Sequence, residues 1–305
     1  MCVYAHYSLL HCCRGAKSDM KIAALIVLYR PDIKTVVKLL QKIESSVDRV
    51  ILIDNTESEM IAHSALSACV AKPWVNYAAL GTNHGLAYAQ NHGLGQLQQT
   101  DCDCVLFLDQ DSRPCKGMIE ALASAYRRLQ SEGRLVAAIG PVIARDGSAP
   151  DSTGGIDEPR CEQTQTLMSS GMLVHRSVLD AVGYFDTTLF IDHVETEWLF
   201  RAQRHGFEVW QARHAHLDHV LGERTVSLRL HRRFEVAIHR PFRYFYQIRN
   251  LMWLLRRRAI PVKWGLVRLF KTLGVVLLCA LIQAPRMSYV GSVGRGLYAG
   301  FIKGI

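Results

Sequence analysis

Short apolar runs alternate with longer amphipathic segments over the first third of the chain. The runs at residues 21–28, 49–53 and 104–108 are bounded by charged or turn-forming residues, and we interpret them as buried strands. After Pro31 and Asp32, apolar residues follow a 3.6-residue period to Ile43, which predicts a helix. A short strand near 75–78 and helices near 60–70 and 86–98 complete the series. Such alternation predicts a parallel sheet with helices on its faces.

Aspartates follow two of these predicted strands. Asp54 ends the second strand, and Asp109 and Asp111 follow the run Val105-Leu106-Phe107-Leu108. Parallel sheets bind ligands at the carboxyl ends of their strands. Two carboxylates one residue apart can hold a hard divalent cation, which can in turn hold a diphosphate. A turn with solvated or capping aspartates is the simpler interpretation of the motif alone, and the metal site is the alternative.

The helix predicted to begin near Leu86 is preceded and lined by small residues. Gly85 stands just before it, and Ala87 and Ala89 follow at alternate positions. A glycine beside a helix N-terminus permits close backbone approach and favours a phosphate group. A capped, tightly packed helix is the alternative interpretation of the same residues.

Acidic residues cluster again before a later amphipathic helix. Asp192, Glu195 and Glu197 lie within six positions, and Trp198 and Leu199 are placed to pack inward. Carboxylates in a first helical turn suit the helix dipole. Three acids exceed what capping needs, and one of them could serve as a general base.

Charge is divided unevenly along the 305 residues, of which 49% are hydrophobic and 21% charged. That composition can bury one large α/β domain, with or without an appendage. Residues 1–198 carry 17 basic and 23 acidic side chains, whereas residues 199–305 carry 19 and 4. No acidic residue follows Glu235. A tail of one sign is typical of proteins that bind a polyanion, either nucleic acid or an anionic membrane.

Aromatic and apolar residues within the tail favour the membrane. The run Arg256-Arg257-Arg258 stands between Trp253 and Trp264, and an uncharged segment follows at 273–282. That segment is shorter than the roughly 20 apolar residues that a membrane span needs. The mixture predicts an interfacial helix lying on a bilayer. A buried helix with a solvated basic face is the alternative.

The nine cysteines lack the paired spacing of a zinc site, and a reducing cytoplasm is the simpler interpretation. Residues 1–19 lack the basic start and apolar core of a signal peptide, and Met20 directly precedes the first strand. We therefore expect residues 1–19 to be an extension outside the folded core.

The motifs, taken in order, resemble those of family-2 glycosyltransferases with the GT-A nucleotide-sugar fold. The resemblance runs from about Lys21 to Gly222 and includes the strand ends Asp54-Asn55 and Asp109-Gln110-Asp111. The other matching segments are Asn83-x-Gly-x-Ala-x-Ala-x-Asn91-x-Gly93, Ser170-Gly171, Gly183-Tyr184-Phe185-Asp186 and Glu195-x-Glu197-Trp198 with Arg201. The resemblance implies a central, mainly parallel sheet flanked by helices, and an inverting transferase.

Three segments resemble bacterial rhamnosyltransferases within that family: Phe-Leu-Asp-Gln-Asp-Ser, Phe-Ile-Asp-x-Val-x-x-Glu-Trp and residues 246–250. Those enzymes transfer L-rhamnose from dTDP-L-rhamnose to a lipid-linked saccharide in the synthesis of surface polysaccharide such as O-antigen. The implied mechanism is a single displacement. A divalent cation, Mg²⁺ or Mn²⁺, neutralises the departing diphosphate while a carboxylate takes the acceptor's proton.

The resemblance also implies roles for individual residues. Glu195 falls at the general base, where the family usually carries aspartate within Glu-Asp-x-Asp, so Asp192 and Glu197 remain alternatives. Asp109 and Asp111 fall at the metal, with His219 as a further candidate ligand. The implied donor-binding residues are Asp54 at the nucleobase, Asn83, Gly85, Asn91, Asp109, Asp111 and Arg249, and the implied acceptor-binding residues are Gly171, Asp192 and Trp198.

We expect a transferase domain at 20–222, with a donor half at about 20–112 and an acceptor half at about 113–222. A basic helical region at 223–305 should associate with the membrane. The expected protein is cytoplasmic, peripheral on the inner face of the cell membrane, and has no nucleic-acid partner. Two alternatives remain: a transferase of the same fold that uses another nucleotide sugar, and a non-catalytic polyanion-binding protein. A nucleotidyltransferase is disfavoured because residues 29–32 lack a glycine-rich, lysine-bearing loop.

Overall fold

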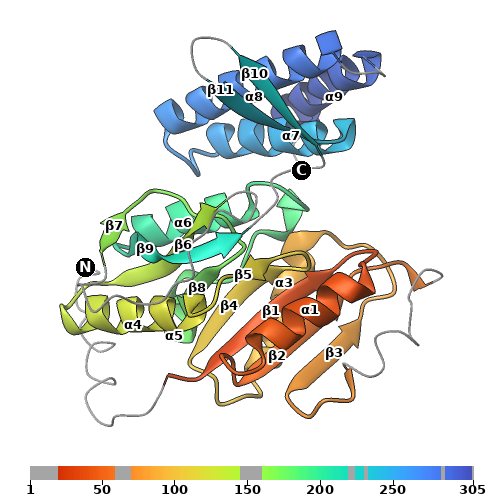
Figure 1. Cartoon of the computed structure of the whole chain (residues 1–305). Coiled ribbons are helices and arrows are strands. Elements are labelled where there is room, and N and C mark those ends of the chain that lie inside the picture. The colour runs from red at the N-terminus through yellow and green to blue at the C-terminus, as the bar shows by residue number, and fades with distance from the viewer. Residues whose placement is uncertain are drawn as a thin grey trace.

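The structure is a computed structural model of the chain and describes residues 20–58, 70–144, 160–218, 224–229, 233–282 and 286–303. A nine-stranded sheet lies at its centre, covered by helices on both faces, and a C-terminal group of helices packs beside it (Figure 1). The strand order is β3-β2-β1-β4-β8-β6-β9-β5, with β7 paired to β9. The predicted helix at 60–70 falls almost wholly outside the described residues.

The first four strands confirm the predicted alternation. They are β1 (Ile22–Leu28), β2 (Arg49–Asp54), β3 (Val75–Ala79) and β4 (Cys104–Asp109), and they pair with one another in parallel. The rest of the sheet contains β5 (Arg113–Pro114), β6 (Val136–Ala144), β7 (Cys161–Gln163), β8 (Met172–His175) and β9 (Glu208–Asp218). There β8 runs antiparallel to β4 and β6, while β6 and β9 pair in parallel. The sheet is therefore parallel across the expected donor half and mixed beyond it.

Side chains of β1 alternate between two hydrophobic cores, as they must in an extended strand. Ile22, Ala24 and Ile26 face the core formed with α1 (Ile33–Ile43) and α4 (Met118–Ser131). Ala23 and Leu25 face the core formed with α3 (Leu86–Leu97), α5 (Arg176–Val182) and α6 (Val194–Arg204). Helices thus cover both faces and leave the carboxyl edge of the sheet for ligands.

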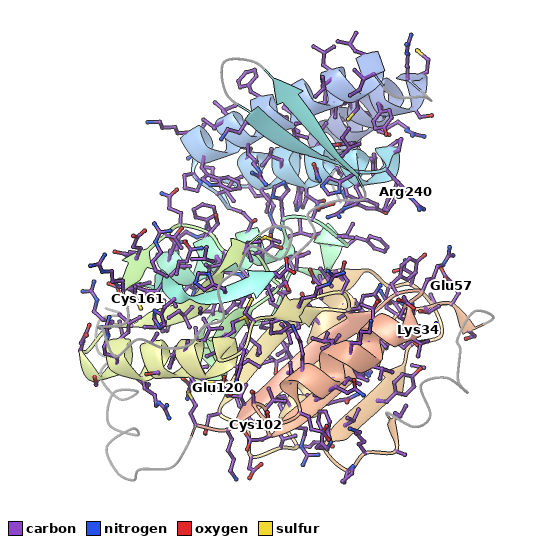
Figure 2. All side chains as sticks on the ribbon, viewed as in Figure 1. Lys34, Glu57, Cys102, Glu120, Cys161 and Arg240 are labelled. Atoms are coloured by element: carbon purple, nitrogen blue, oxygen red, sulfur yellow. The ribbon has the colours of Figure 1, made fainter. Side chains whose placement is uncertain are left out.

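The C-terminal unit (residues 224–229, 233–282 and 286–303) contains the expected helices and, in addition, a β-hairpin that was not predicted from the sequence. It opens with the antiparallel hairpin β10 (Arg224–Arg229) and β11 (Arg233–Ile238). Three helices follow, α7 (Pro241–Arg256), α8 (Val262–Ile282) and α9 (Arg286–Tyr298), and a short π-helix, η4 (Ala299–Lys303), ends the described chain. Arg240, labelled in Figure 2, is exposed where the hairpin passes into α7.

The C-terminal unit shares a hydrophobic core with the sheet domain. Leu251 and Leu254 of α7 are buried in the same cluster as α3 and α6, and Ile260 follows them there. Among the described residues, α8 is the helix whose length and composition are sufficient to cross a bilayer. Helix α8 starts at Val262, well before the uncharged segment at 273–282. Most of the helix is exposed.

Candidate active site

Asp54 and Asp109 end the two strands that flank β1, so both lie at the predicted edge. In the sheet register Asp54 pairs with Leu28 and Asp109 with the preceding residue, Val27. The Asp54 carboxylate is buried and accepts hydrogen bonds from Tyr77 Oη and the Thr56 amide, each at 3.0 Å. Burial, followed by the Asp54 charge, raises the pKa of Tyr77, which keeps this donor protonated.

The Asp109–Asp111 turn is fixed to the end of β1 through its middle residue. The Gln110 side chain accepts from the Tyr29 amide at 2.9 Å and donates to the Tyr29 carbonyl at 3.2 Å. The Ser112 amide closes the turn onto the Asp109 carbonyl at 3.0 Å. Asp109 is half-buried, whereas Asp111 is exposed. These hydrogen bonds fix the backbone of the turn, with the Asp109 side chain against the protein and the Asp111 side chain in solvent.

Two carboxylates at such a turn fit a hard divalent cation, because Mg²⁺ and Mn²⁺ prefer oxygen ligands. No group of three or more His, Cys, Asp or Glu side chains suited to a metal occurs within the described part of the chain. A Mg²⁺ site typically takes one or two carboxylates and completes its octahedron with phosphate oxygens and water. Asp109 and Asp111 fit that pattern. His219 lies outside the described residues, so its candidacy rests on the sequence.

The loop before α3 is held by its neighbours on both sides. Asn55 Nδ2 donates to Asn83 Oδ1 at 3.0 Å, and Asn55 Oδ1 accepts from the His84 amide at 2.9 Å. Gly85 has φ of 88°, and an added Cβ would lie 2.5 Å from Phe190 Cδ2. The Leu86 amide, at the start of α3, donates to the Phe190 carbonyl at 2.6 Å. Close packing of Phe190 therefore accounts for the glycine, and donor contact by Asn83 and Gly85 stays a prediction.

Asn91 links α3 to the acceptor half by a reciprocal pair of hydrogen bonds. Its Nδ2 donates to the Phe185 carbonyl at 2.8 Å, and its Oδ1 accepts from the Phe185 amide at 3.0 Å. Both ends of the amide are thus used within the protein. Asn91 positions the two halves relative to one another, and direct contact with a donor stays a prediction.

The three acidic residues beside α6 occupy different environments. Asp192 Oδ1 lies 2.6 Å from Nη2 of Arg243 on α7. Glu197 is buried and paired with Arg201 at 2.9 Å. Glu195 accepts a 3.3 Å hydrogen bond from Thr196 Oγ1 and forms no ion pair with the described residues.

Burial raises the pKa of Glu195 to about 7, and the nearby charges of Asp192 and Asp109 add to the effect of burial. The pKa of Arg243 is also raised, since the carboxylates of Asp192, Asp109 and Glu195 together outweigh its burial. Asp109 therefore interacts electrostatically with both Glu195 and Arg243, which places the expected metal turn near the expected base. A carboxylate with a pKa near 7 suits a general base at neutral pH. The geometry favours Glu195 among the three acids.

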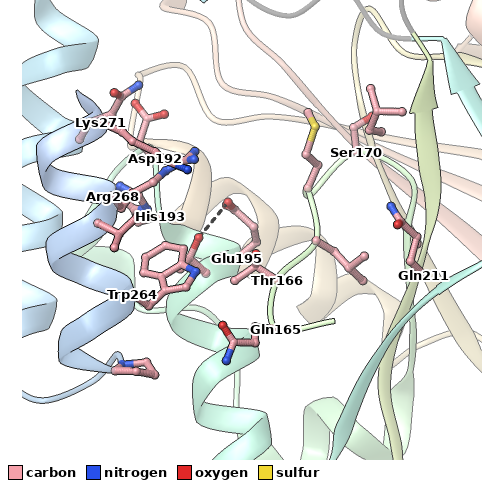
Figure 3. A pocket seen from close by; sticks show the side chains of 18 of the residues that line it. Gln165, Thr166, Ser170, Asp192, His193, Glu195, Gln211, Trp264, Arg268 and Lys271 are labelled. Atoms are coloured by element: carbon pink, nitrogen blue, oxygen red, sulfur yellow. Dashed lines mark hydrogen bonds between the residues drawn. The ribbon is translucent and has the colours of Figure 1, made fainter. Parts of the chain in front are cut away.

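Glu195 lines a cavity of about 820 Å³ between the acceptor half and the C-terminal unit (Figure 3). Gln165, Thr166 and Gln211 line the sheet side, while Trp264, Arg268 and Lys271 line the α8 side. Its volume falls within the range of small-molecule sites. His193 also lines the cavity, and burial lowers the pKa of this imidazole to about 4, so it is neutral at physiological pH.

Two predicted acceptor-binding residues act through packing. Trp198 has no exposed surface, and its Nε1 donates to the Gly183 carbonyl at 2.8 Å. This corrects the expectation of acceptor contact, because a fully buried indole cannot touch a ligand. Gly171 has φ of 86°, and an added Cβ would lie 2.6 Å from Pro141 Cγ. The neighbouring Ser170 lines the cavity instead.

Residues of α7 that sequence reasoning missed, or assigned elsewhere, hold the 188–193 loop in front of α6. Asn250 Nδ2 lies 2.7–2.8 Å from the carbonyls of Leu189, Ile191 and Asp192. Arg249, expected to bind the donor, donates to the Thr188 and Leu189 carbonyls at 2.9 Å. The Asp192–Arg243 contact and the contacts of Asn250 with the loop join residues that are 51 or more positions apart. A local sequence pattern therefore could not predict them.

The fold is shared with solved glycosyltransferase structures. Staphylococcus aureus TarS 1–349, in complex with UDP-GlcNAc, aligns with a TM-score of 0.54 and 14% identity, over 92% of this chain and 81% of that one. GalNAc-T7 with UDP, GalNAc and Mn²⁺ also aligns with a TM-score of 0.54, at 12% identity, over 67% of this chain and 44% of that chain. The architecture is therefore the GT-A fold of nucleotide-sugar glycosyltransferases.

Sequence comparison gives the family. Residues 28–179 match the family described as Glycosyl transferase family 2. The chain is 31% identical over 257 residues to dTDP-rhamnosyl transferase RfbF of Shigella flexneri, which covers 80% of this chain and 83% of that protein. The chain belongs to glycosyltransferase family 2 and is a nucleotide-sugar glycosyltransferase.

Proposed function

We propose that this enzyme transfers L-rhamnose from dTDP-L-rhamnose to a hydroxyl of a saccharide acceptor, with inversion at the anomeric carbon. The likeness to dTDP-rhamnosyl transferase supports the donor. The observation that carries the proposed chemistry is Glu195, whose pKa is raised to about 7 beside a cavity of about 820 Å³ and near the Asp109 carboxylate.

Asp54 would hold the nucleobase end of the donor, and Asp109 with Asp111 would hold Mg²⁺ or Mn²⁺ against its diphosphate. Bound there, the cation would supply charge neutralisation for the leaving group. Glu195 takes the proton from the acceptor hydroxyl while that oxygen bonds to the anomeric carbon and the bond to the diphosphate breaks. Asp192, which is paired with Arg243, lines the same cavity as Glu195.

The acceptor that we propose is a lipid-linked saccharide used in surface polysaccharide such as O-antigen. The protein would work in the cytoplasm, on the inner face of the membrane. Exposed apolar side chains of α8 support this placement, including Phe270 at 69% and Leu277 at 63% exposure. Basic residues on the same unit would add attraction to anionic lipids. We also propose the division into an N-terminal extension (1–19), a transferase domain (20–222) and a membrane-associating region (223–305).

The direct test is release of dTDP from dTDP-L-rhamnose in the presence of Mn²⁺ and a bacterial membrane extract that supplies the acceptor. We expect turnover in the wild type, and none after chelation or in Asp111→Ala with folding intact. Undiminished turnover in Asp111→Ala would contradict the metal assignment. Turnover of another nucleotide sugar in place of dTDP-L-rhamnose would favour the same-fold alternative.

The non-catalytic alternative has its own signature. A polyanion-binding protein on an inactive domain would bind DNA with a steep salt dependence and would bind no nucleotide sugar. We expect the opposite outcome. The protein should bind the nucleotide sugar, and duplex DNA titrated at 50 and 200 mM salt should not compete with it.

A further inference from the structure

One face of α8 forms a wall of the cavity that contains Glu195. Trp264, Arg268 and Lys271 are spaced by four and three residues, which places them on the same side of a helix. All three line the cavity, together with Lys263 near the start of the helix. Figure 3 shows Trp264, Arg268 and Lys271 on this helix, with Asp192 and Glu195 across from it.

The positive charges on this wall are unmatched by carboxylates of the protein. Lys263, Arg268 and Lys271 are exposed and form no ion pair within the described ranges. On the other wall, Asp192 is already neutralised by Arg243. Glu195 carries only part of a charge near neutral pH because its pKa is about 7. Three cations beside a cavity with little opposing charge attract an anion, and guanidinium and ammonium groups bind phosphate oxygens well.

A different face of α8 is apolar and exposed. Leu266 is 42% exposed and Phe270 is 69% exposed, and the apolar surface continues toward Leu277 and Leu281. The same helix therefore presents cations to the cavity and hydrocarbon to the outside. A ligand with a phosphate beside a long hydrocarbon chain matches both faces at once.

We propose that Lys263, Arg268 and Lys271 form a phosphate subsite for the acceptor, which enters as a saccharide joined through phosphate to a lipid. Its saccharide occupies the cavity so that a hydroxyl reaches Glu195, and its hydrocarbon runs along the exposed side of α8. Trp264 gives the subsite an apolar floor, since its ring is fixed against Phe200 at a centroid distance of 5.3 Å. This assignment rests on the proposed function, because Glu195 must meet an acceptor hydroxyl.

The test is calorimetric titration of the full chain with geranyl diphosphate, inorganic pyrophosphate and geraniol. EDTA is present throughout, so that no metal holds a diphosphate at Asp109 and Asp111. We expect geranyl diphosphate to bind, and the double variant Arg268→Ala/Lys271→Ala to weaken it at least about tenfold, since charge-assisted hydrogen bonds are lost. Pyrophosphate and geraniol should bind much more weakly than geranyl diphosphate, because each offers only half of the recognised chemistry.

The matched control is Arg286→Ala/Arg295→Ala on α9, which also removes two charges from the C-terminal unit. Both arginines are exposed and neither lines the cavity. We expect less than a twofold change in this control. Equal weakening in both double variants, or no binding of geranyl diphosphate, would overturn the subsite. Pyrophosphate binding as tight as that of geranyl diphosphate would overturn the lipid part, and equal binding of geraniol would overturn the phosphate part.

Failure of this subsite and failure of the proposed function give different results. The titration uses no nucleotide sugar, so a wrong donor assignment leaves it unchanged. The thermal unfolding midpoint without ligand checks that each double variant keeps its fold. Loss of geranyl diphosphate binding specific to Arg268→Ala/Lys271→Ala, with that midpoint unchanged, is the supporting result.

Discussion

Glu195 and Glu197 stand in the same helical turn, yet their environments give them different chemistry. Arg201 neutralises Glu197 and also donates to the carbonyls of Val182 and Tyr184, which fixes that carboxylate as part of the packing. Glu195 pairs with no cation among the described residues, and burial raises its pKa. The i, i+4 spacing of Glu197 and Arg201 was visible in the sequence and could have removed Glu197 from the candidates. The pairing of Asp192 with Arg243 was not visible, because 51 residues separate them.

Glu195→Gln should therefore lower kcat by roughly 10²–10⁴-fold, the usual contribution of a general base, and leave dTDP binding unchanged. Glu197→Gln is the matched control. It should lower the free energy of unfolding by about 3 kcal/mol because it leaves Arg201 half-buried without its partner. Steady-state kinetics and urea unfolding of both variants separate the two roles. A Glu195→Gln enzyme with normal kcat would exclude Glu195 as the base.

Glu195 should also give the enzyme opposite pH dependences for activity and stability. Because its pKa rises from 4.5 to about 7 on folding, the folded state binds this proton more tightly than the unfolded state does. That stabilisation is complete below about pH 4.5 and is lost as pH rises through 7, while kcat rises over the same interval as the base ionises. Glu195→Gln should be more stable than the wild type at pH 8, by on the order of 2 kcal/mol. If the free energies of unfolding of the wild type and Glu195→Gln differed by the same amount at pH 5 and at pH 8, the raised pKa would be contradicted.

At the scale of elements, α7 holds the 188–193 loop in a conformation that few residues adopt. Phe190, Asp192 and His193 have φ values of 61°, 65° and 63°. Left-handed backbone of this kind costs about 1–3 kcal/mol per residue and persists where the surroundings enforce it. Asn250, fully buried, supplies hydrogen bonds to three carbonyls of this loop. A helix outside the expected transferase domain thus positions the loop that leads to Glu195.

Asn250→Asp should lower kcat at least about tenfold and destabilise the fold by about 3 kcal/mol, because oxygen replaces the donor that faces these carbonyls. Asn76→Asp on β3 is the matched control. There the Asn76 Oδ1 accepts from Arg49 Nη1 at 3.1 Å, and aspartate keeps that acceptor. The two variants are compared by kcat at saturating dTDP-L-rhamnose and by thermal unfolding. Similar behaviour of both would show that the loop does not depend on α7.

The exposed side of α8 should act as the membrane contact. Phe270→Asp removes an aromatic ring that is 69% exposed and should weaken binding to phosphatidylglycerol-containing vesicles about tenfold or more. Leu135→Asp, at a site 46% exposed on the sheet domain, adds the same charge and should leave binding within about twofold of wild type. Flotation of both variants measures the difference. Equal loss in both, or in neither, would contradict the assignment of α8.

Among the elements, the sequence revealed those whose signals are local. The parallel strands β1 to β4 and the start of α1 after Asp32 follow from periodicity, turn residues and capping, and Asp32 does accept from the Lys34 amide. The antiparallel insertion of β8 between β4 and β6 could not be predicted in this way, because strand order depends on partners distant in the chain. The β10–β11 hairpin was missed for a different reason, since residues 223–305 were treated as one basic helical region.

On the scale of the whole molecule, charge is segregated along the chain while the core is continuous. The first 198 residues carry an acidic excess, and residues 199–305 carry 19 basic and 4 acidic side chains. The two parts nevertheless share a hydrophobic cluster through Leu251 and Leu254. A basic appendage on a flexible tether would give no such cluster. The Asp109–Asp111 turn, Glu195 and the C-terminal unit therefore belong to one folded body.

The most direct measurement of the central claim is thermal unfolding of the wild type and Asp111→Ala with a panel of nucleotide sugars, with Mn²⁺ or with EDTA. We expect dTDP-L-rhamnose with Mn²⁺ to stabilise the wild type by about 2.7 kcal/mol at 100 times its Kd, which raises the Tm of a chain of 305 residues by roughly 4 °C. UDP-GlcNAc and GDP-mannose should give little shift, and both EDTA and Asp111→Ala should abolish the effect of dTDP-L-rhamnose. Stabilisation by dTDP-L-rhamnose that survives EDTA and Asp111→Ala, or no stabilisation by any nucleotide sugar, would contradict the account.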